Sequence, residues 1–251
     1  MRKDDMRKEL SIVIPTRNEE KNIANCVNGI VKELNSIKNL AYEIVIVNNN
    51  STDRTQEKIN QLKKKYPSIV RGVFEKKQSF GNSAKAGIAA VRGEYFCLVM
   101  ADHSENPKDI TKMVRLIKKN KYDAIHTNRF RKKDLAKDYP KAKFFFNRLG
   151  NTALALLYLV KFTDLSNAFR LIRTDIIRGC KLRSSGFELT LELSLLTIIR
   201  GKKFAEVDVH WYNRLEGEAY WKLGKTLVRY LKPLLYYLPY RYGILKLKIE
   251  E

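Results

Sequence analysis

The sequence has little cysteine and little histidine, with three residues of each among its 251. Cys26, Cys97 and Cys180 lie far apart and lack the close spacing of cysteine metal sites. An odd number of cysteines in apolar surroundings is typical of reduced thiols in a cytosolic protein. We therefore expect three buried thiols rather than a framework of disulfides.

Long hydrophobic runs are also absent. The longest uncharged stretch in the apolar part of the sequence, residues 149–160, is shorter than the roughly 20 residues that a helix needs to span a bilayer. The first ten residues are rich in charge and contain no apolar segment of the kind found in signal peptides. The sequence therefore predicts neither a transmembrane helix nor a signal peptide.

Acidic residues are scarce relative to basic ones. The chain has 27 Asp and Glu against 49 Lys and Arg, which gives a formal net charge of +22. Such a charge favours an anionic partner, namely nucleic acid, an acidic membrane surface or a phosphorylated substrate. The hydrophobic content of 44% is typical of a globular chain rather than a disordered one. The length allows one large α/β domain or two small domains.

Short apolar segments alternate with segments in which apolar residues have helical spacing. Strands are expected at residues 10–15, 43–47, 69–74, 95–100, 122–127 and 203–211. Alternation of strands with helices indicates parallel βαβ units. Most of these strands are continuously apolar, which indicates a sheet covered by helices on both faces. No repeat or low-complexity linker interrupts the pattern, so we expect one α/β domain with a basic C-terminal extension.

Polar residues follow several of these strands at the point where each strand ends. In open parallel sheets, ligands bind beyond the carboxyl ends of the strands. Residues 15–19, 48–53 and 102–105 are therefore expected along one rim of the sheet. The last of these segments, with the sequence "DHSE", comes directly after a buried strand, and its position favours a site over a simple turn.

Four stretches carry a resemblance to a known family: "SIVIPTRNEEKNI", "EIVIVNNNSTDRT", "GNSAKAGIAAVRGEYFCLVMADHSENP" and "DLSNAFRLIRTDII". In this order they resemble family 2 glycosyltransferases of the GT-A fold, above all dolichyl-phosphate mannose synthases and related polyprenyl-phosphate glycosyltransferases. The resemblance covers about residues 9–224. It implies a Rossmann-like, mostly parallel sheet with helices on both faces in residues 1–224, with C-terminal amphipathic helices. Residues 225–251 are then a basic tail that binds a membrane surface or a partner.

The resemblance also assigns residues to the nucleotide sugar. In the family, the first aspartates of "DDGSTD" contact the base, and this chain has "NNNSTD" there. An asparagine amide both accepts and donates hydrogen bonds, so it can still accept from a base N–H. Asn50 replaces the glycine of the family, and asparagine tolerates a positive φ better than most residues. The candidates for nucleotide-sugar binding are Pro15, Arg17, Glu19, Asn48, Asn49, Lys85 and Asp102.

The segment after the fourth strand departs from the family pattern "DADLxxP", in which two aspartates hold a divalent metal. Counted from the proline of that pattern, their positions are occupied by Ala101 and His103, with Asp102 between them. Either His103 and Glu105 face the metal, or the chain is shifted by one residue and Asp102 binds together with Ser104 or Glu105. Mg²⁺ and Mn²⁺ prefer oxygen ligands, and imidazole suits Mn²⁺ better than Mg²⁺. We favour Asp102 and Glu105, with His103 as a further candidate; loss of the metal site is the remaining alternative.

Basic residues in the second half of the chain are implied to bind the acceptor phosphate. The family has "SGFR" where this chain has "NAFR", and the arginine of its "RxxGxSK" motif corresponds to Arg214. The candidates are Arg129, Lys143, Asn167, Arg214 and Lys222. Residues 141–160 combine a basic start with aromatic and leucine residues, which predicts either an interfacial helix on a membrane or a core helix.

The resemblance implies an inverting glycosyltransferase that moves a sugar from a GDP- or UDP-sugar to a polyprenyl phosphate, at the cytoplasmic face of a membrane. Asp102, Arg129 and Arg214 are the expected catalytic residues, and Mg²⁺ or Mn²⁺ stabilises the leaving diphosphate. The expected partners are an anionic membrane surface and, as an open alternative, a protein that anchors the chain to the membrane. We expect no nucleic-acid partner, because no motif for nucleic-acid binding is present.

The chemistry of the acceptor leaves alternatives open. A lipid phosphate is already an anion near neutral pH and needs no general base. A hydroxyl acceptor of a glycolipid or glycan needs a carboxylate to take its proton, for which the candidates are Asp164, Glu188 and Glu192. Because aspartate is missing at positions 48, 49 and 101, an inactive protein that binds sugar nucleotides is a third alternative.

Overall fold

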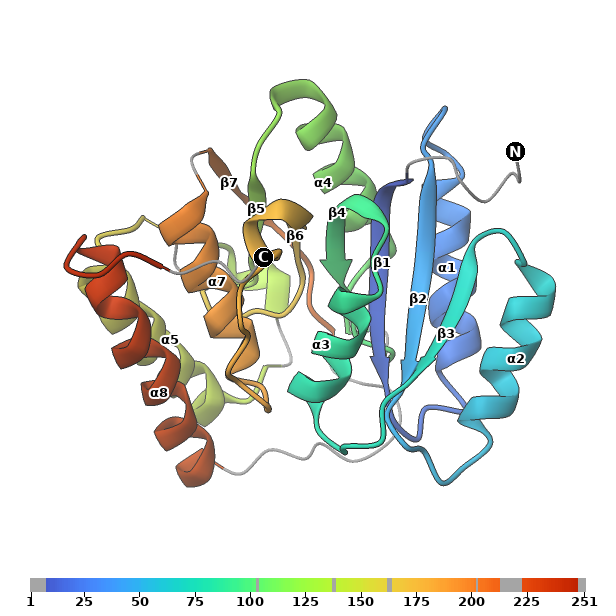
Figure 1. Cartoon of the computed structure of the whole chain (residues 1–251), viewed down its shortest axis with the longest axis horizontal. Coiled ribbons are helices and arrows are strands. Elements are labelled where there is room, and N and C mark those ends of the chain that lie inside the picture. Colours follow the sequence, from blue (N-terminus) through green and yellow to red (C-terminus); the bar gives the residue numbers. More distant parts are fainter. Residues whose placement is uncertain are drawn as a thin grey trace.

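A seven-stranded sheet forms the middle of the described structure, with helices on both of its faces (Figure 1). The computed structural model describes residues 8–102, 104–136, 139–161, 164–201, 203–212 and 223–247. The strands are β1 (Lys8–Thr16), β2 (Tyr42–Asn48), β3 (Val70–Phe74), β4 (Gly93–Leu98), β5 (Ala124–Asn128), β6 (Arg170–Arg173) and β7 (Phe204–Asp208). The helices are α1 (Ile23–Leu34), α2 (Thr55–Lys65), α3 (Phe80–Ala89), α4 (Pro107–Asn120), the 3₁₀ helix η2 (Lys133–Ala136), α5 (Lys141–Leu157), α6 (Thr174–Ile177), α7 (Leu189–Arg200) and α8 (Leu223–Arg241).

The strand order is β3-β2-β1-β4-β6-β5-β7. β1 pairs in parallel with both β2 and β4, and β2 pairs in parallel with β3. β6 runs antiparallel between β4 and β5, and β7 lies parallel to β5 at the edge. The expectation of a mostly parallel α/β sheet is confirmed. Every strand expected from the sequence is present, with ends that differ by three residues or fewer.

One strand, β6, was not expected from the sequence. It has only four residues, too few to show a period, and it begins with a charged residue, Arg170. Leu171 pairs with Cys97 of β4 on one side and with Ile125 of β5 on the other. Pairing with two neighbouring strands, rather than a local pattern, therefore forms this strand.

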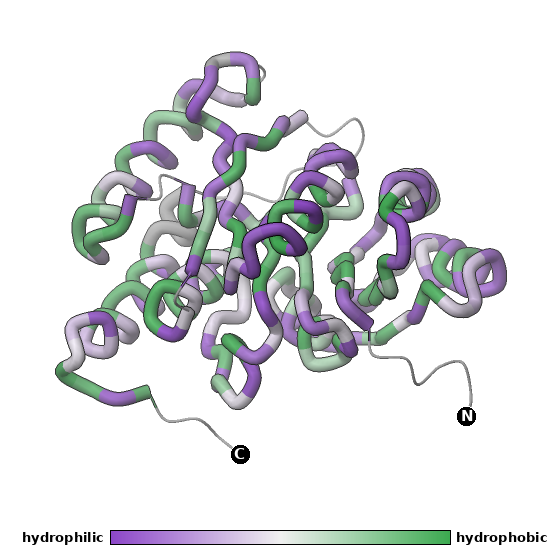
Figure 2. Tube along the Cα trace, turned by 90° about the horizontal axis from the view of Figure 1, so that it is seen from above, coloured by the Kyte–Doolittle hydropathy of each residue, from purple (hydrophilic) through white to green (hydrophobic). Residues whose placement is uncertain are grey.

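Alternate residues of the central strands point into two separate cores. Ile12 and Ile14 of β1 pack with α1, α2 and α4, whereas Val13 packs with α3, α7 and α8. The predicted covering of both faces is thus confirmed. Seen from above, the strands in the middle are largely hydrophobic, and the surrounding helices mix hydrophobic and hydrophilic residues (Figure 2). Cys26 and Cys97 are buried as expected, but Cys180 is only half-buried.

The helix α8 packs against α7. Tyr237 of α8 is 2% exposed, and its hydroxyl donates to Oε1 of Glu192 on α7 at 2.8 Å. Figure 1 places α8 beside α5, and the hydroxyl of Tyr158 at the end of α5 donates to the Leu234 carbonyl of α8 at 2.7 Å. α8 therefore shares a hydrophobic core with α7 and α3.

α5 and α8 also carry large apolar side chains on their outer surfaces. On α5, Phe145 is 62% exposed and Leu156 is 71% exposed, and on α8 Leu235 is 63% exposed. Both helices therefore present apolar side chains to the outside as well as to the core. In the described ranges, no helix combines the length and the hydropathy needed to cross a membrane.

Candidate functional site

Two loops at the carboxyl ends of β1 and β2 are joined by hydrogen bonds. The N–H of Asn18 donates to Oγ of Ser51 at 3.1 Å, and the N–H of Thr52 donates to Oδ1 of Asn18 at 2.9 Å. Asn18 and Asn50 each have a φ of 53°. The positive φ of Asn50 confirms that asparagine can take the place of the family's glycine. Hydrogen bonds within the chain therefore hold this part of the predicted rim together.

Asn48 is 3% exposed, and its amide is used inside the protein. Its Oδ1 accepts from the N–H of Ser51 at 3.0 Å, and its Nδ2 donates to Oε1 of Gln56 at 2.7 Å. The side chain therefore closes the turn after β2 and ties it to α2. Contact between Asn48 and a base stays a prediction.

Asn49, also 3% exposed, fixes the loop between β3 and α3. Its Nδ2 donates to the carbonyls of Glu75 and Lys77 at 3.1 and 2.9 Å, and its Oδ1 accepts from the N–H of Ser79 at 2.8 Å. An aspartate has no side-chain N–H and could not make the first two bonds. The amide thus has a structural role at this position, and contact with a base stays a prediction.

Arg17 places a cation on the exposed side of the rim. Its Nη2 donates to Oε1 of Gln78 at 2.9 Å, and Nε2 of Gln78 donates to the carbonyl of Asn50 at 3.2 Å. Gln78 could not be identified from the sequence, because it lies in a loop without a motif and reaches the rim only in the folded chain. Arg17 and Gln78 together connect the loops that follow β1, β2 and β3.

The remaining nucleotide candidates lie on or beside the same rim. Pro15 is part of β1, opposite Val47 of β2. Oε2 of Glu19 accepts from Nδ2 of Asn22 at 2.7 Å, which closes the loop just before α1. Lys85 is half-buried on α3, the helix whose start is held by Asn49. Binding of a nucleotide sugar by these residues stays a prediction.

Two carboxylates stand at the end of β4. Glu105 is 8% exposed, and its Oε2 accepts from the N–H of Met100 at 3.1 Å. Burial, followed by the negative charge of Asp102, raises the pKa of Glu105 to about 8. Asp102 is half-buried, and its Oδ1 accepts from the N–H of Ser104 at 3.1 Å. Asp102 is therefore close enough for its charge to disfavour the charged form of Glu105.

Glu19 is a third acid whose charge acts in the same region as Asp102 and Glu105. Burial raises the pKa of the Cys26 thiol, and the negative charges of Glu105, Asp102 and Glu19 raise it further. The negative charges of all three acids therefore reach one buried residue, Cys26. Among the residues that the structure describes, no three His, Cys, Asp or Glu side chains are arranged as a set of metal ligands. His103 lies outside the described residues.

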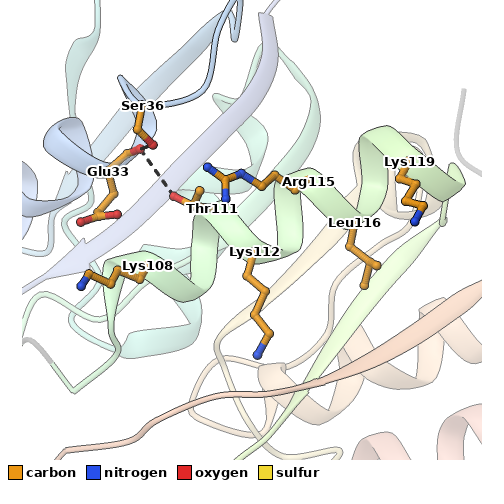
Figure 3. Close-up of a pocket in the computed structure, with 8 residues that line it drawn as sticks. All are labelled: Glu33, Ser36, Lys108, Thr111, Lys112, Arg115, Leu116 and Lys119. Carbon is orange, nitrogen blue, oxygen red and sulfur yellow. Dashed lines mark hydrogen bonds between the residues drawn. The ribbon is translucent and has the colours of Figure 1, made fainter.

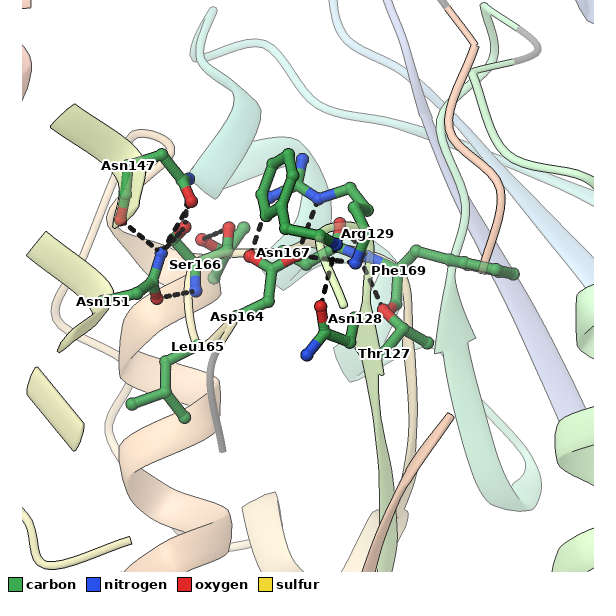
Figure 4. A network of polar contacts seen from close by, with 12 residues as sticks. Thr127, Asn128, Arg129, Asn147, Asn151, Asp164, Leu165, Ser166, Asn167 and Phe169 are labelled. Atoms are coloured by element: carbon green, nitrogen blue, oxygen red, sulfur yellow. Dashed lines mark hydrogen bonds and ion pairs between the residues drawn. The ribbon is translucent and has the colours of Figure 1, made fainter. Parts of the chain in front are cut away.

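Arg129, which directly follows β5, forms a two-point ion pair with Asp164 (Figure 4). Its Nε and Nη2 donate to the two carboxylate oxygens at 2.8 and 2.9 Å. The guanidinium lies 5.0 Å from the ring centre of Phe130 and 5.7 Å from that of Tyr139. Burial opposes the charge of Arg129, but Asp164 outweighs it and holds the pKa of Arg129 above its ordinary value. The cation is thus fixed in orientation and permanently charged.

Asn167 and its neighbour Ser166 connect this ion pair to the helices. Asn167 is 5% exposed and donates through Nδ2 to Oγ1 of Thr127 at 2.6 Å. Oγ of Ser166 accepts from Nδ2 of Asn147 at 3.1 Å and from Nδ2 of Asn151 at 3.2 Å, both on α5 (Figure 4). The loop at 164–167 is therefore anchored to β5 and α5, and contact between Asn167 and an acceptor phosphate stays a prediction.

The three carboxylates considered as general bases all accept hydrogen bonds inside the protein. Both oxygens of Asp164 are bonded to Arg129. Oε1 of Glu188 accepts from two backbone N–H groups at 3.1 and 2.9 Å, and the two oxygens of Glu192 accept from two others at 2.8 and 2.7 Å. Asp164 therefore orients Arg129, and Glu188 and Glu192 hold the backbone of residues 183–186 in place.

The other acceptor-site candidates are placed only in part. Lys143 lies in the first turn of α5, but the structure does not describe its side chain. Arg214 and Lys222 lie outside the described residues.

The histidine of β5, His126, is an interior residue. It is 2% exposed, and its Nε2 lies 3.0 Å from Oγ1 of Thr197.

A hollow of about 430 Å³ lies away from this rim, between α1 and α4 (Figure 3). None of the candidate residues named above lines it. Its lining residues are Glu33, Ser36, Lys108, Thr111, Lys112, Arg115, Leu116 and Lys119. The rim at the carboxyl ends of the strands, with Arg129 beside it, therefore remains the candidate site.

The fold is the α/β architecture of GT-A enzymes. It matches glucosyl-3-phosphoglycerate synthase from Mycobacterium tuberculosis, solved with Mn²⁺, UDP and phosphoglyceric acid, with a TM-score of 0.70 and 16% identity. The match covers 92% of this chain and 78% of that one. The same enzyme solved with Mg²⁺ and UDP also gives a TM-score of 0.70. At this level of identity the likeness defines the fold alone.

Residues 11–180 match Glycosyl transferase family 2, and the chain belongs to this family. It is 31% identical over 233 residues to a dolichol-phosphate mannosyltransferase of Pyrococcus furiosus, which covers 89% of this chain and 62% of that protein. It is 27% identical over 217 residues to a dolichyl-phosphate beta-glucosyltransferase of Trichomonas vaginalis, which covers 83% of this chain and 67% of that protein. The chain thus spans less than two thirds of the length of the Pyrococcus protein. The family expected from the sequence motifs is confirmed.

Proposed function

We propose that this chain is an inverting glycosyltransferase that moves a sugar from a nucleotide sugar to a polyprenyl phosphate. The observation that carries the proposal is the Arg129–Asp164 pair, which holds a charged guanidinium beside the ligand rim. An anionic acceptor needs a fixed cation to position it, and Arg129 supplies one with the planar geometry that suits phosphate oxygens. The internal hydrogen bonds of Asp164, Glu188 and Glu192 support a phosphate acceptor over a hydroxyl acceptor.

In the proposed reaction, an oxygen of the acceptor phosphate attacks the anomeric carbon of the sugar. The bond from that carbon to the nucleoside diphosphate breaks, and the diphosphate leaves with the electron pair. Nε and Nη2 of Arg129 donate to Asp164, and within the described residues no acceptor is bonded to Nη1, which we assign to the acceptor phosphate. Lys143, Asn167, Arg214 and Lys222 complete the acceptor site. Arg17 and the loops after β1 and β2 bind the nucleotide.

A divalent cation fits the carboxylates of Asp102 and Glu105. Both supply oxygen ligands of the kind that Mg²⁺ and Mn²⁺ prefer. Burial and the charge of Asp102 raise the pKa of Glu105, and a bound cation would oppose this rise because it favours the charged form of the carboxylate. Such a cation would neutralise charge on the leaving diphosphate. The Mycobacterium enzyme solved with Mn²⁺ or Mg²⁺ supports this choice of metal.

The chain is proposed to lie on the cytoplasmic face of an anionic membrane through α5 and α8. Their exposed apolar side chains, such as Leu156 and Leu235, are placed to enter the interface. Basic residues near an anionic surface contribute about 1 kcal/mol each, and the chain has a net charge of +22. A polyprenyl phosphate lies in the same interface, so this docking would bring acceptor and enzyme together.

The test is a screen of GDP- and UDP-sugars against a polyprenyl phosphate, with Mn²⁺ or with a chelator. We expect a lipid-linked sugar phosphate from one donor, formed only with metal and strongly reduced but still measurable in Arg129→Ala. Arg131→Ala is the matched control, since Arg131 is half-exposed and pairs with Glu206 and Asp208 at the far edge of the sheet. Transfer to hydroxyl acceptors alone would overturn the proposed acceptor. Donor binding without transfer to any acceptor would identify an inactive sugar-nucleotide binder.

A further inference from the structure

Arg170 of β6 is a buried arginine for which the described residues supply no carboxylate partner. It is 1% exposed, and its Nε has no hydrogen-bond partner. Burial lowers the pKa of Arg170 to about 10, which leaves it charged at neutral pH. A buried charge without a carboxylate bonded to it opposes folding. An apolar residue at position 170 would pack at least as stably, so packing does not explain why the residue is an arginine.

Nη1 and Nη2 of Arg170 both contribute to holding the loop at residues 164–167. Nη2 donates to the carbonyl of Leu165 at 3.1 Å, and Nη1 donates to Oγ of Ser194 on α7. The hydroxyl of Ser194 in turn donates to the same Leu165 carbonyl at 2.6 Å. Two side chains, one from β6 and one from α7, therefore hold a single carbonyl oxygen in place.

Leu165 directly follows Asp164, the residue that orients Arg129 (Figure 4). Both oxygens of Asp164 accept from Arg129, and among the described residues no hydrogen bond or ion pair joins Asp164 to Arg170. Asp164 nevertheless stabilises the charge of Arg170, and Arg129 opposes it, which shows that the three groups form one electrostatic cluster. A shift of the Leu165 carbonyl would move Asp164 and with it the guanidinium of Arg129.

We infer that Arg170 is a positioning residue for the acceptor phosphate. It fixes the Leu165 carbonyl, this fixes Asp164, and Asp164 aims Arg129. Arg170 does not itself touch substrate, because it is fully enclosed. The inference rests on the proposed function for the role of Arg129 and adds a residue that acts on the acceptor through two others.

The test compares Arg170→Lys and Ser194→Ala in the wild-type and Arg129→Ala backgrounds. Lysine keeps the charge but lacks the planar fork that reaches two acceptors. In the wild-type background we expect kcat/KM for polyprenyl phosphate to fall about tenfold, as for a lost hydrogen bond to a charged group, with the KM of the donor unchanged within about twofold. Arg173→Lys is the control, since Arg173 lies on the same strand and pairs with Asp123 and Asp175.

The Arg129→Ala background decides between positioning and general support of the fold. If Arg170 acts through Arg129, then Arg170→Lys and Ser194→Ala cause little further loss once Arg129 is absent. Losses that multiply in that background, or a donor KM that rises as much as the acceptor KM, would overturn the inference. If Arg170→Lys does not fold, Ser194→Ala decides the matter, because it removes one donor and no charge.

Hydrogen exchange on the full chain separates this inference from the proposed function. The N–H of Ser166 donates to Oδ1 of Asn151 at 3.2 Å and reports on the loop next to Leu165. We expect this amide to exchange faster in Arg170→Lys and Ser194→Ala but not in Arg173→Lys. A wild-type chain without transfer to polyprenyl phosphate would refute the proposed function. Unchanged exchange at Ser166 would refute the positioning role, whatever the activity.

Discussion

The side-chain oxygen of Asn49 accepts a hydrogen bond from the backbone N–H of Ser79, at 2.8 Å. This bond joins the end of β2 to the N-cap of α3, where the hydroxyl of Ser79 accepts from the N–H of Asn82 at 3.2 Å. The nitrogen of the same Asn49 amide donates to two backbone carbonyls. One buried amide therefore holds the loop that borders the predicted nucleotide site.

The first prediction compares Asn49→Asp with Asn48→Asp. At position 49 a carboxylate would face two carbonyl oxygens that now receive hydrogen bonds, so we expect a loss of about 2 kcal/mol or more in the free energy of unfolding. At position 48 the acceptor for Ser51 is kept, and Gln56 can turn its amide nitrogen from Asn60 toward the new oxygen. We expect a change of about 0.5 kcal/mol there. Urea unfolding measures both, and equal losses would contradict the different roles of the two asparagines.

The second prediction concerns the carboxylates after β4. Asp102→Ala should abolish turnover and metal-dependent binding of the sugar nucleotide while the fold is kept, because it removes a ligand oxygen at the rim. Isothermal titration with Mn²⁺ and with a chelator measures the binding. Asp175→Ala is the control, since the Asp175 side chain is 59% exposed and pairs with Arg173.

Full activity of Asp102→Ala would refute the assignment of Asp102 as a metal ligand. Loss of activity in His103→Ala or Glu105→Ala instead would favour the other register of the motif.

The third prediction concerns pH. Burial, followed by the charge of Arg170, lowers the pKa of His126 from its ordinary 6.5 to about 3. Between these values the unfolded chain binds a proton that the folded chain does not. The contribution of His126 to stability is therefore complete above about pH 6.5 and decreases as the pH falls toward about 3.

His126→Gln removes this titration and can keep a hydrogen bond to Thr197. We expect the stability of wild type to fall more steeply with acid than that of the variant. Thermal unfolding at several pH values between about 7.5 and 4.5 makes the comparison. Parallel curves for the two proteins would contradict the lowered pKa of His126 in the folded chain.

The fourth prediction concerns membrane association. At low salt we expect the chain to float with anionic vesicles, high salt to release part of it, and detergent to release the rest. Charge attraction is screened by salt, whereas burial of apolar side chains is not. Phe145→Glu combined with Leu156→Glu should abolish the salt-resistant part. Phe74→Glu is the control, because Phe74 is 60% exposed but lies on β3 at the opposite edge of the sheet. Wild-type protein that stays in the soluble fraction at low salt would refute the docking.

Much of the fold could be predicted because its strands are buried on both sides and read as continuous apolar runs. The segments 10–15 and 43–47 correspond to β1 and β2 for this reason. The backbone at Asn50 could also be predicted, because few residues other than glycine tolerate its φ. The strand β6 could not be predicted, because its four residues, which begin with Arg170, are too few to show a strand pattern. It forms because β4 and β5 pair with it on either side.

The candidate site could be predicted only where local chemistry defines it. Asp102 and Glu105 stand out because acids directly follow an apolar strand. Asp164 was considered as a general base, and only the fold shows that both of its oxygens bind Arg129, a residue distant in the sequence. Gln78 reaches the rim through the packing of a loop, for which the sequence has no signal.

The most direct test of the proposed function compares polyprenyl phosphate with the matching free polyprenol as acceptors in one assay. The donor is labelled, and the product is identified by mass spectrometry. We predict that the sugar is attached only to the phosphate oxygen, and that Arg129→Ala strongly reduces this product while donor binding persists. Sugar attached only to the free alcohol, in a reaction that survives Arg129→Ala, would contradict both the acceptor and the role of the Arg129–Asp164 pair.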